Sequence, residues 1–281
     1  MDKTTLTINI NKSTLNLSSP IVMGILNSTP DSFFKGNRFT TDRSILNRVE
    51  QILMDGGNIV DVGGFSTRPS AEPIGQDEEV KRVSSALEVI LKKFPQTILS
   101  VDTFRSGVAR HVVHNYNVGI INDISGGTLD DLMFETIAEL DVAYVLMHTR
   151  GTPQTMQSLT NYQDVVAEVF SFLEKRIARL HLLGVNNIII DPGFGFAKTM
   201  DQNYDILRKL SYFKELNTPI LAGISRKSML YKLIDSTPEL ALNTTTAANM
   251  LALVGGASIL RVHDVKEAKE TIMIYNQYNN H

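Results

Sequence analysis

Residues 98–125 read ILSVDTFRSGVARHVVHNYNVGIINDIS and contain one unit of the predicted fold. Two short apolar runs, at 98–101 and 120–121, have the composition of buried strands, and the longer segment between them has the composition of a helix. Asp102 directly follows the first run, and Asn122 follows the second. Strands joined through a helix run parallel, so both polar side chains are expected at the same end of a sheet.

The same unit recurs along the chain after residue 20. Short apolar runs, each bounded by Gly, Pro, Asn or Asp, alternate with longer amphipathic stretches. Eight strands, each followed by a helix, predict an α/β fold of the (β/α)8 TIM-barrel type. A doubly wound open sheet is the alternative topology, and the number of strands favours the barrel. The runs lie at residues 21–26, 59–62, 98–101, 120–121, 143–147, 188–190, 220–222 and 258–260.

Three of the predicted helices carry signals at their ends. Asp77 predicts the N-cap of a helix that Pro95 stops. Gly184 predicts the glycine just beyond the C-terminus of another helix. Thr237 and Pro238 predict the N-cap and the first residue of a third.

The composition fits one α/β domain. The chain has 281 residues, 43% of them hydrophobic and 20% charged, and single barrels commonly reach this length. We expect one domain over 1–281, with a short N-terminal β-hairpin at 1–20 covering the bottom of a barrel at 21–281. The formal net charge of −3 gives no argument for a nucleic-acid partner. The sequence has no cysteine, no leader-like start and no apolar run of about 20 residues, so we expect a cytoplasmic protein without a membrane segment.

Chemically versatile residues follow the eight predicted strands. In a parallel barrel these positions form one rim, where active sites of this fold are built. Asx and Ser residues also end strands as turn formers, so any single position could be purely structural. Carboxylates, imidazoles, a guanidinium and an ammonium at one rim together favour a single site. The residues are Asn27, Asp61, Gly63, Asp102, Asn122, Asp123, His148, Asp191, Ser225, Arg226, Lys227, Arg261 and His263.

Two connections on this rim are long. They run from Asn27 to Asp42 and from Gly63 to Gln76, and structureless loops beyond about 12–15 residues are usually functional or disordered. Together they contain hydroxyl groups, aromatic rings and a guanidinium. This content is typical of loops that cover a substrate.

Two groups of basic residues predict an anion site. Arg261 and His263 lie two residues apart, so in an extended chain their side chains point the same way, and this side of a barrel often binds phosphate. Arg can hold a phosphate through two N–H donors and His can add a third, although a surface salt bridge is the structural alternative. The segment at 225–228 opens a helix whose first N–H groups favour an anion. Lys227 could instead bond a carbonyl of a heterocycle, or the charges there could simply be solvated.

Three further strand-end residues, Asp102, Asn122 and Asp191, could converge on the barrel mouth. Their oxygens suit the amino and ring N–H groups of a planar, amidine-like heterocycle. From the residues alone they are polar ligand contacts of unknown identity, and each could be a buried structural residue. Asn27 is a neutral oxygen ligand that could make one bond to a Mg²⁺ ion with waters and phosphate oxygens as its other ligands, although spacing alone does not reveal a metal site.

Eight segments between residues 23 and 265, taken in order, resemble the signatures of the dihydropteroate synthase family. They are MGILNSTPDSF (23–33), GGFSTRP (63–69), SVDT (100–103), INDISGG (121–127), MH (147–148), DPGFGF (191–196), SRKS (225–228) and RVHDV (261–265). The resemblance implies a TIM-barrel transferase that condenses 6-hydroxymethyl-7,8-dihydropterin pyrophosphate with p-aminobenzoate. The products would be 7,8-dihydropteroate and pyrophosphate. It also implies Mg²⁺ as cofactor and a homodimer.

The resemblance further implies roles for individual residues. The implied pterin contacts are Asp102, Asn122, Met147, Asp191 and Lys227. The implied pyrophosphate contacts are Arg261 and His263, with Asn27 and Mg²⁺. The implied p-aminobenzoate pocket is formed by Phe33, Thr67 and Arg68, with Ser228 near the carboxylate. The implied catalytic group is Asp102, Lys227, Arg261 and His263, and on these roles Arg261→Ala should reduce turnover severely and leave pterin binding largely intact.

The family mechanism ionises the C–O bond first, and the aniline then traps the pterin cation. The chain departs from the family at Phe65, Ser70 and Ala197, where Glu, Gly and Gly are usual, and the first two alter the second long loop. Two alternatives share the pterin-binding barrel: a methyltetrahydrofolate:corrinoid methyltransferase and a non-catalytic pterin-binding paralogue. The predicted anion site at Arg261 and His263 argues against both.

Overall fold

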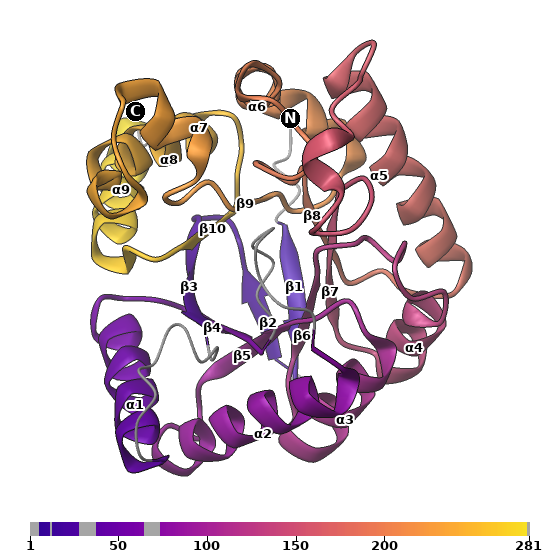
Figure 1. Cartoon of the computed structure of the whole chain (residues 1–281), viewed down its shortest axis with the longest axis vertical. Coiled ribbons are helices and arrows are strands. Elements are labelled where there is room, and N and C mark those ends of the chain that lie inside the picture. Colours follow the sequence, from indigo (N-terminus) through magenta and orange to yellow (C-terminus); the bar gives the residue numbers. More distant parts are fainter. Residues whose placement is uncertain (1–5, 12, 28–37, 65–73, 280–281) are drawn as a thin grey trace.

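Eight parallel strands form the centre of the molecule, in the order β8-β7-β6-β5-β4-β3-β10-β9. The computed structural model describes residues 6–11, 13–27, 38–64 and 74–279, with the backbone alone at 38–41. The sheet curls until its edges meet (Figure 1), where Ile190 of β8 forms a parallel bridge with Ile220, just before β9. The predicted TIM barrel is therefore confirmed. The strands are β3 (Ile21–Asn27), β4 (Ile59–Gly63), β5 (Ile98–Asp102), β6 (Ile120–Asp123), β7 (Ala143–Met147), β8 (Ile188–Asp191), β9 (Leu221–Ala222) and β10 (Ile259–Val262).

Helices follow the strands and surround the barrel (Figure 1). The α-helices are α1 (Arg38–Met54), α2 (Gln76–Lys93), α3 (Ser106–Tyr116), α4 (Met133–Leu140), α5 (Val165–Leu182), α6 (Met200–Arg208), α7 (Ser228–Tyr231), α8 (Leu242–Val254) and α9 (Val265–Asn279). Short 3₁₀ turns lie at η1 (Met156–Ser158), η2 (Leu210–Leu216), η3 (Lys232–Ile234) and η4 (Pro238–Leu240). Among the described helices, none has both the length and the apolar content that crossing a bilayer requires.

The predicted helix ends were partly right. Gly184 lies just beyond α5 with φ +84°, as predicted for a C-terminal glycine. The N-cap of α2 is Gly75, so the prediction of Asp77 was wrong; that carboxylate lies in the first turn, where it complements the helix dipole. The first long connection is also shorter than predicted, because α1 already begins at Arg38.

The predicted N-cap at Thr237 and first helical residue at Pro238 were right, but the helix that they open is not the α-helix. These residues form the 3₁₀ turn η4, and the α-helix begins only at Leu242. The Arg226 guanidinium donates to the carbonyls of Pro238 and Glu239 at 2.8 and 2.7 Å. A continuing α-helix would use those carbonyls as acceptors for its own N–H groups, so a tertiary contact stabilises the turn instead.

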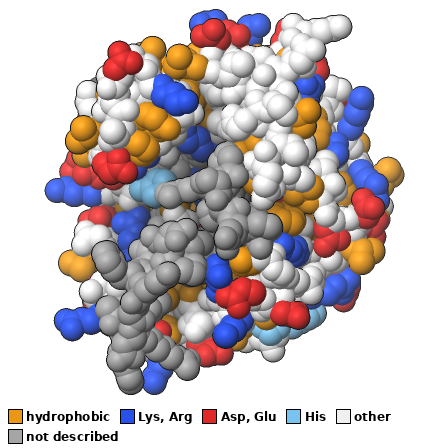
Figure 2. All heavy atoms as spheres, in the orientation of Figure 1, with side chains coloured by type: hydrophobic (Ala, Val, Ile, Leu, Met, Phe, Trp, Pro, Cys, Tyr) orange, Lys and Arg blue, Asp and Glu red, His pale blue; other side chains and the backbone are white. Residues whose placement is uncertain are grey.

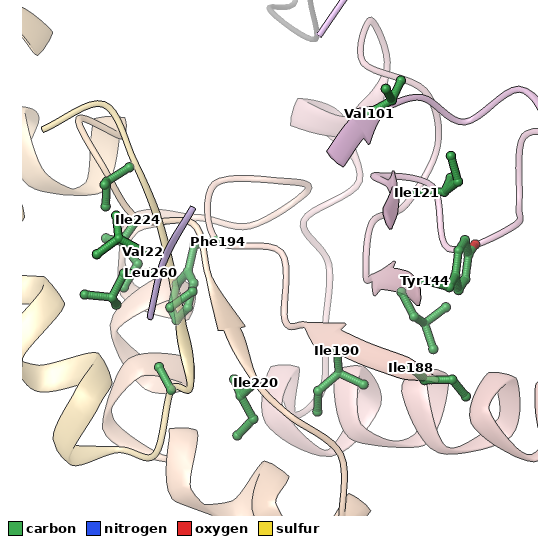
Figure 3. Close-up of a cluster of buried hydrophobic side chains, with 14 of the residues drawn as sticks. Val22, Val101, Ile121, Tyr144, Ile188, Ile190, Phe194, Ile220, Ile224 and Leu260 are labelled. Carbon is green, nitrogen blue, oxygen red and sulfur yellow. The ribbon is translucent and has the colours of Figure 1, made fainter. Parts of the chain in front are cut away.

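Apolar side chains fill two layers. One lies between the barrel strands and the helices, and Figure 3 shows part of it, where Val22, Ile224 and Leu260 lie near Phe194. The other fills the lower half of the barrel interior with the inward residues of the strands.

The hairpin predicted at the N-terminus closes the bottom of the barrel. Its strands β1 (Thr7–Ile10) and β2 (Ser13–Asn16) are antiparallel, and Ile8 and Ile10 pack into the apolar layer inside the barrel. Asn9 exchanges two hydrogen bonds, of 3.0 and 2.6 Å, with Asn187, just before β8. Because the hairpin covers the ends where the strands begin, only the C-terminal ends are left for a site.

Candidate functional site

The barrel interior changes from apolar to polar along its axis. Ile59, Ile120 and Ile259 belong to the apolar layer inside the barrel. Two residues further along the same strands stand Asp61, Asn122 and Arg261. Alternate residues of a strand share a face, so these polar side chains also point inward, one level nearer the mouth.

Arg261 is the centre of this polar level. Its Nε donates to Asp61 Oδ2 at 2.7 Å, and its Nη2 donates to Asp102 Oδ2 at 2.8 Å. Nη2 also lies 2.6 Å from Asp61 Oδ2. The edge of the guanidinium that carries Nε and Nη2 is therefore engaged by two carboxylates. No described residue bonds Nη1, which is left for a ligand.

These ion pairs are buried, and burial shifts their protonation. Desolvation raises the pKa of Asp102 to about 7; Arg261 opposes this shift, and the neighbouring Asp61 adds to it. The two carboxylates outweigh the desolvation of Arg261 and raise the pKa of its guanidinium, which stays charged. Asp102 therefore changes charge near neutral pH while its partner does not, a property typical of functional groups.

Lys227 and Asp191 both lie close to Gly223 and interact electrostatically. A Cβ atom added to Gly223 would lie 3.7 Å from Asp191 Oδ2 and 3.9 Å from Lys227 Nζ. Lys227 Nζ also donates to the Phe194 carbonyl and lies 4.6 Å from the centroid of the Phe196 ring. Burial lowers the pKa of Lys227 to about 8 and raises the pKa of Asp191, and each charge partly offsets the shift of the other.

His263 is held by Ser225. The Ser225 hydroxyl accepts from the backbone N–H of His263 at 3.2 Å and lies 3.1 Å from Nδ1 of the ring. One hydroxyl can accept the first bond and donate the second, which leaves the ring proton on Nε2. Burial, with Arg261 nearby, lowers the pKa of His263 to about 4. The ring is therefore neutral at pH 7 and can donate from Nε2.

The 225–228 segment does not act as one anion site. Arg226 has φ +55° and turns towards Asp264, with which it makes two bonds of 2.9 and 2.7 Å. Ser228 is exposed at the start of α7, which has only four residues. Lys227 is thus the member of this segment that the fold brings to the mouth.

The other predicted site residues lie at the rim or outside the described chain. Asn27 ends β3 in register with Gly63, and it is exposed. Met147 ends β7, is buried, and pairs with Asp191. In the described part of the chain, no three His, Asp or Glu side chains group as a metal site, so Asn27 alone would be a weak protein ligand. Phe33, Thr67 and Arg68 lie outside the described residues, as do the departures Phe65 and Ser70.

Sequence analysis placed His148 at the rim but missed its buried partner, Lys198. Lys198 Nζ donates to the carbonyls of Gly193 and Phe196 at 2.9 and 3.0 Å, and it lies 3.0 Å from His148 Nδ1. These bonds fix the turn after β8, whose Phe194 carbonyl meets Lys227. The preceding residue, Ala197, is buried with φ +50°, a left-handed conformation that explains why glycine is usual there.

Arg48 was also missed as a site residue. Arg48 of α1 donates to the carbonyls of His263 and Ile25 at 2.6 and 3.3 Å, and so fixes the backbone at the end of β10. An arginine in a helix gives no sequence signal for this contact. Asp61 was recognised as a strand-end residue and given no role.

Comparison with known proteins identifies this constellation. The family model for pterin binding enzymes matches residues 23–263. Dihydropteroate synthase of Escherichia coli strain K12 is 39% identical over 264 residues, which cover 93% of each chain. The chain belongs to the dihydropteroate synthase family. The predicted family and the predicted transferase class are therefore confirmed.

Solved structures of the dihydropteroate synthase family have the same fold. Xanthomonas albilineans dihydropteroate synthase with 4-aminobenzoic acid has a TM-score of 0.91 at 35% identity, covering 99% of this chain and all of that one. The same enzyme in complex with 7,8-dihydropteroate has a TM-score of 0.87 at 33% identity, covering 98% of this chain and all of that one. The likeness thus extends over the whole barrel.

Proposed function

We propose that the chain condenses 6-hydroxymethyl-7,8-dihydropterin pyrophosphate with p-aminobenzoate, giving 7,8-dihydropteroate and pyrophosphate in folate biosynthesis. The convergence of Asp102, Asn122, Asp191, Lys227 and Arg261 at one end of the barrel carries this proposal. It combines acceptors for a heterocycle with donors for an anion. The structures of relatives with 4-aminobenzoic acid and with 7,8-dihydropteroate support the choice of substrates.

The pterin lies at the polar level of the barrel interior. Its amino and ring N–H groups donate to Asp102, Asn122 and Asp191, and its ring carbonyl accepts from Lys227. Both side chains lie next to Gly223, which has no side chain of its own to fill the space between them, and this supports a site where one planar ring reaches both. Met147, buried beside Asp191 at the end of β7, supplies an apolar contact.

The pyrophosphate binds at the rim above the pterin. Arg261 donates through Nη1, and His263 donates through Nε2, because the other edges of both side chains are already bonded. Asn27, exposed at the end of β3, would offer one oxygen to a Mg²⁺ ion bound with the pyrophosphate. The ion would offset the negative charge that grows on the leaving group.

The reaction starts with cleavage of the C–O bond. Both electrons leave with the pyrophosphate, and the resulting pterin cation is stabilised by the Asp102 carboxylate. The aniline nitrogen then forms the new C–N bond and loses a proton. This route requires no nucleophilic side chain, and a preorganised set of charges does the work.

The remaining assignments follow the family. Phe33, Thr67 and Arg68 form the p-aminobenzoate pocket, with the exposed Ser228 near its carboxylate. The chain forms a homodimer, for which the apolar, more than half exposed Leu251 and Val254 of α8 offer a surface. Its location is the cytoplasm, a proposal that the lack of cysteine supports.

Nucleic acid is not among the proposed partners. On the face that Figure 2 shows, basic and acidic side chains of the described residues are interspersed. A nucleic-acid surface would instead gather positive charge on one face.

The experiment is pyrophosphate release by the purified protein with the dihydropterin pyrophosphate and Mg²⁺, with and without p-aminobenzoate. Release that depends on p-aminobenzoate, together with dihydropteroate formation, supports the synthase. Tight pterin binding without turnover would point to a non-catalytic paralogue. Methyl transfer that needs a corrinoid partner would point to the methyltransferase.

A further inference from the structure

Asp61 is the most deeply buried carboxylate of the polar level, and the reaction as proposed gives it no contact with substrate. It has no solvent exposure, whereas the side chain of Arg261 above it is 20% exposed. Asp61 is therefore separated from the mouth by the groups it bonds, and any effect on a ligand passes through them.

Its hydrogen bonds join strands on both sides of β4. Oδ2 accepts from Asn122 Nδ2 at 3.1 Å and from Arg261 Nε at 2.7 Å. Asn122 lies on β6 and Arg261 on β10, each two places from β4 in the sheet order. Oδ1 accepts from Ser100 Oγ of the adjacent strand β5 at 2.6 Å.

These bonds determine what two neighbours offer to a ligand. A carboxylate only accepts, so Asn122 must turn its NH₂ group towards Asp61. Its Oδ1 accepts no hydrogen bond within the described part of the chain and remains as the acceptor for a ligand N–H group. The same carboxylate oxygen holds Arg261 Nε and so sets the plane in which Nη1 faces the mouth.

We propose that Asp61 is a positioning residue that fixes the acceptor face of Asn122 and the plane of Arg261 for a bound pterin. The inference rests on the proposed function and adds to it a residue that acts without touching the substrate. It makes the pocket specific for a heterocycle with N–H donors opposite Asn122.

The test compares three variants by calorimetric titration with 6-hydroxymethylpterin, which lacks the pyrophosphate. Asp61→Ala removes the acceptor, and we expect pterin affinity to fall about 10- to 100-fold, as for loss of a hydrogen bond to a charged group. Asp61→Asn should stay within about five-fold of wild type, since Ser100 can accept from the new amide NH₂ while the remaining oxygen keeps Asn122 and Arg261 in place.

Tyr144→Phe is the matched control. The Tyr144 hydroxyl donates at 2.6 Å to Asp123, another fully buried carboxylate, but in the layer outside the barrel. This variant also breaks a buried hydrogen bond to a carboxylate, and it should bind pterin like wild type. If Asp61→Ala does not fold, the double variant Asp61→Asn with Ser100→Ala replaces it. In that variant the new amide NH₂ group has lost its acceptor, Ser100. We expect the double variant to bind pterin at least ten-fold more weakly than Asp61→Asn alone.

Each outcome separates this inference from the proposed function. Wild-type affinity in folded Asp61→Ala would overturn the inference, and so would an Asp61→Asn variant as weak as Asp61→Ala, since charge rather than geometry would then matter. Equal losses in Tyr144→Phe would overturn it by showing a general effect of destabilisation. A wild-type protein that does not bind 6-hydroxymethylpterin would instead overturn the proposed pterin pocket itself.

Discussion

Arg261 reaches across the inside of the barrel to Asp102, with Nη2 and Oδ2 2.8 Å apart. Their strands, β10 and β5, are separated by β3 and β4 in the sheet, so the pair spans the interior. Before any ligand binds, the guanidinium already neutralises charge inside the protein. An anion at the rim therefore meets an arginine that is held in place rather than one that is free to move.

The first prediction concerns removal of this arginine. Arg261→Ala leaves Asp61 and Asp102 without their cation, and breaking a buried pair in this way typically costs about 3–5 kcal/mol. Since Arg261 is partly exposed, we expect a loss of about 2–4 kcal/mol in the free energy of unfolding, measured by urea denaturation. Pterin affinity should fall together with turnover, contrary to the expectation from sequence that binding survives. An unchanged dissociation constant for pterin would contradict this.

Arg226 provides the contrasting prediction. Its guanidinium bonds Asp264 and two carbonyls away from the mouth. Arg226→Ala should lower the free energy of unfolding by about 1–2 kcal/mol and change the KM for the pterin pyrophosphate less than about three-fold. Steady-state kinetics at matched folded fractions would measure this. A KM as high as that of the Arg261 variant would mean that Arg226 binds the substrate after all.

The dependence of activity on pH should be a narrow bell. Asp102 has its pKa raised to about 7, so below that pH it becomes protonated and no longer stabilises the cation. Lys227 has its pKa lowered to about 8, so above that pH the ammonium loses its proton. Because kcat/KM reports groups of the free enzyme, its profile should rise near pH 7 and fall near pH 8.

Two variants assign the limbs of that bell. Asp102→Asn should abolish the acid limb and reduce kcat/KM about 100-fold or more. Lys227→Met should abolish the alkaline limb and mainly weaken pterin binding. An acid limb that persists in Asp102→Asn would show that another group, such as Asp191, titrates there.

His263 should contribute a pH dependence to stability. Its pKa is lowered from 6.5 to about 4 in the folded protein, so below pH 6.5 the unfolded chain binds a proton that the folded chain does not. Stability is therefore lost as the pH falls from 6.5 towards 4. When the pH is lowered from 7 to 5, the free energy of unfolding of wild type should fall by about 1–2 kcal/mol more than that of His263→Gln, as measured by urea denaturation. Equal losses in both proteins would contradict a neutral, buried imidazole.

The sequence predicted those parts of the fold and site that depend on local pattern. Apolar runs with polar ends located the strands, and Asp102, Asn122 and Asp191 do lie at one end of the barrel because parallel strands bring their ends together. The start of α8 depended instead on a contact from Arg226, twelve residues away from Pro238. No local signal marks such a contact, so the sequence predicted the cap at Thr237 but not the separate 3₁₀ turn between it and the α-helix.

The partners of Arg261 could not be predicted for a similar reason. The sequence predicted that Arg261 and His263, two residues apart in an extended segment, bind an anion together. The guanidinium instead meets Asp61, 200 residues earlier in the chain, and Asp102, 159 residues earlier. Contacts between inward side chains depend on how the barrel closes and on the height of each residue along the barrel axis. The sequence of a single strand gives neither.

Lys198 leads to the last prediction, because its amino group is buried and no carboxylate among the described residues bonds to it. It is 4% exposed, and three acceptors surround Nζ: His148 Nδ1 and the carbonyls of Gly193 and Phe196. Lys198→Met keeps the side-chain length but leaves these acceptors without their donor, and a buried unsatisfied group costs about 1–3 kcal/mol. We expect the free energy of unfolding to fall by about 2–4 kcal/mol. Pterin affinity should fall as well, since the turn that presents the Phe194 carbonyl to Lys227 loses its support.

The control is Lys232→Met, which replaces an exposed lysine and should alter neither the free energy of unfolding nor the pterin affinity. Equal urea midpoints for Lys198→Met and Lys232→Met would show that the buried Lys198 side chain does not hold this turn.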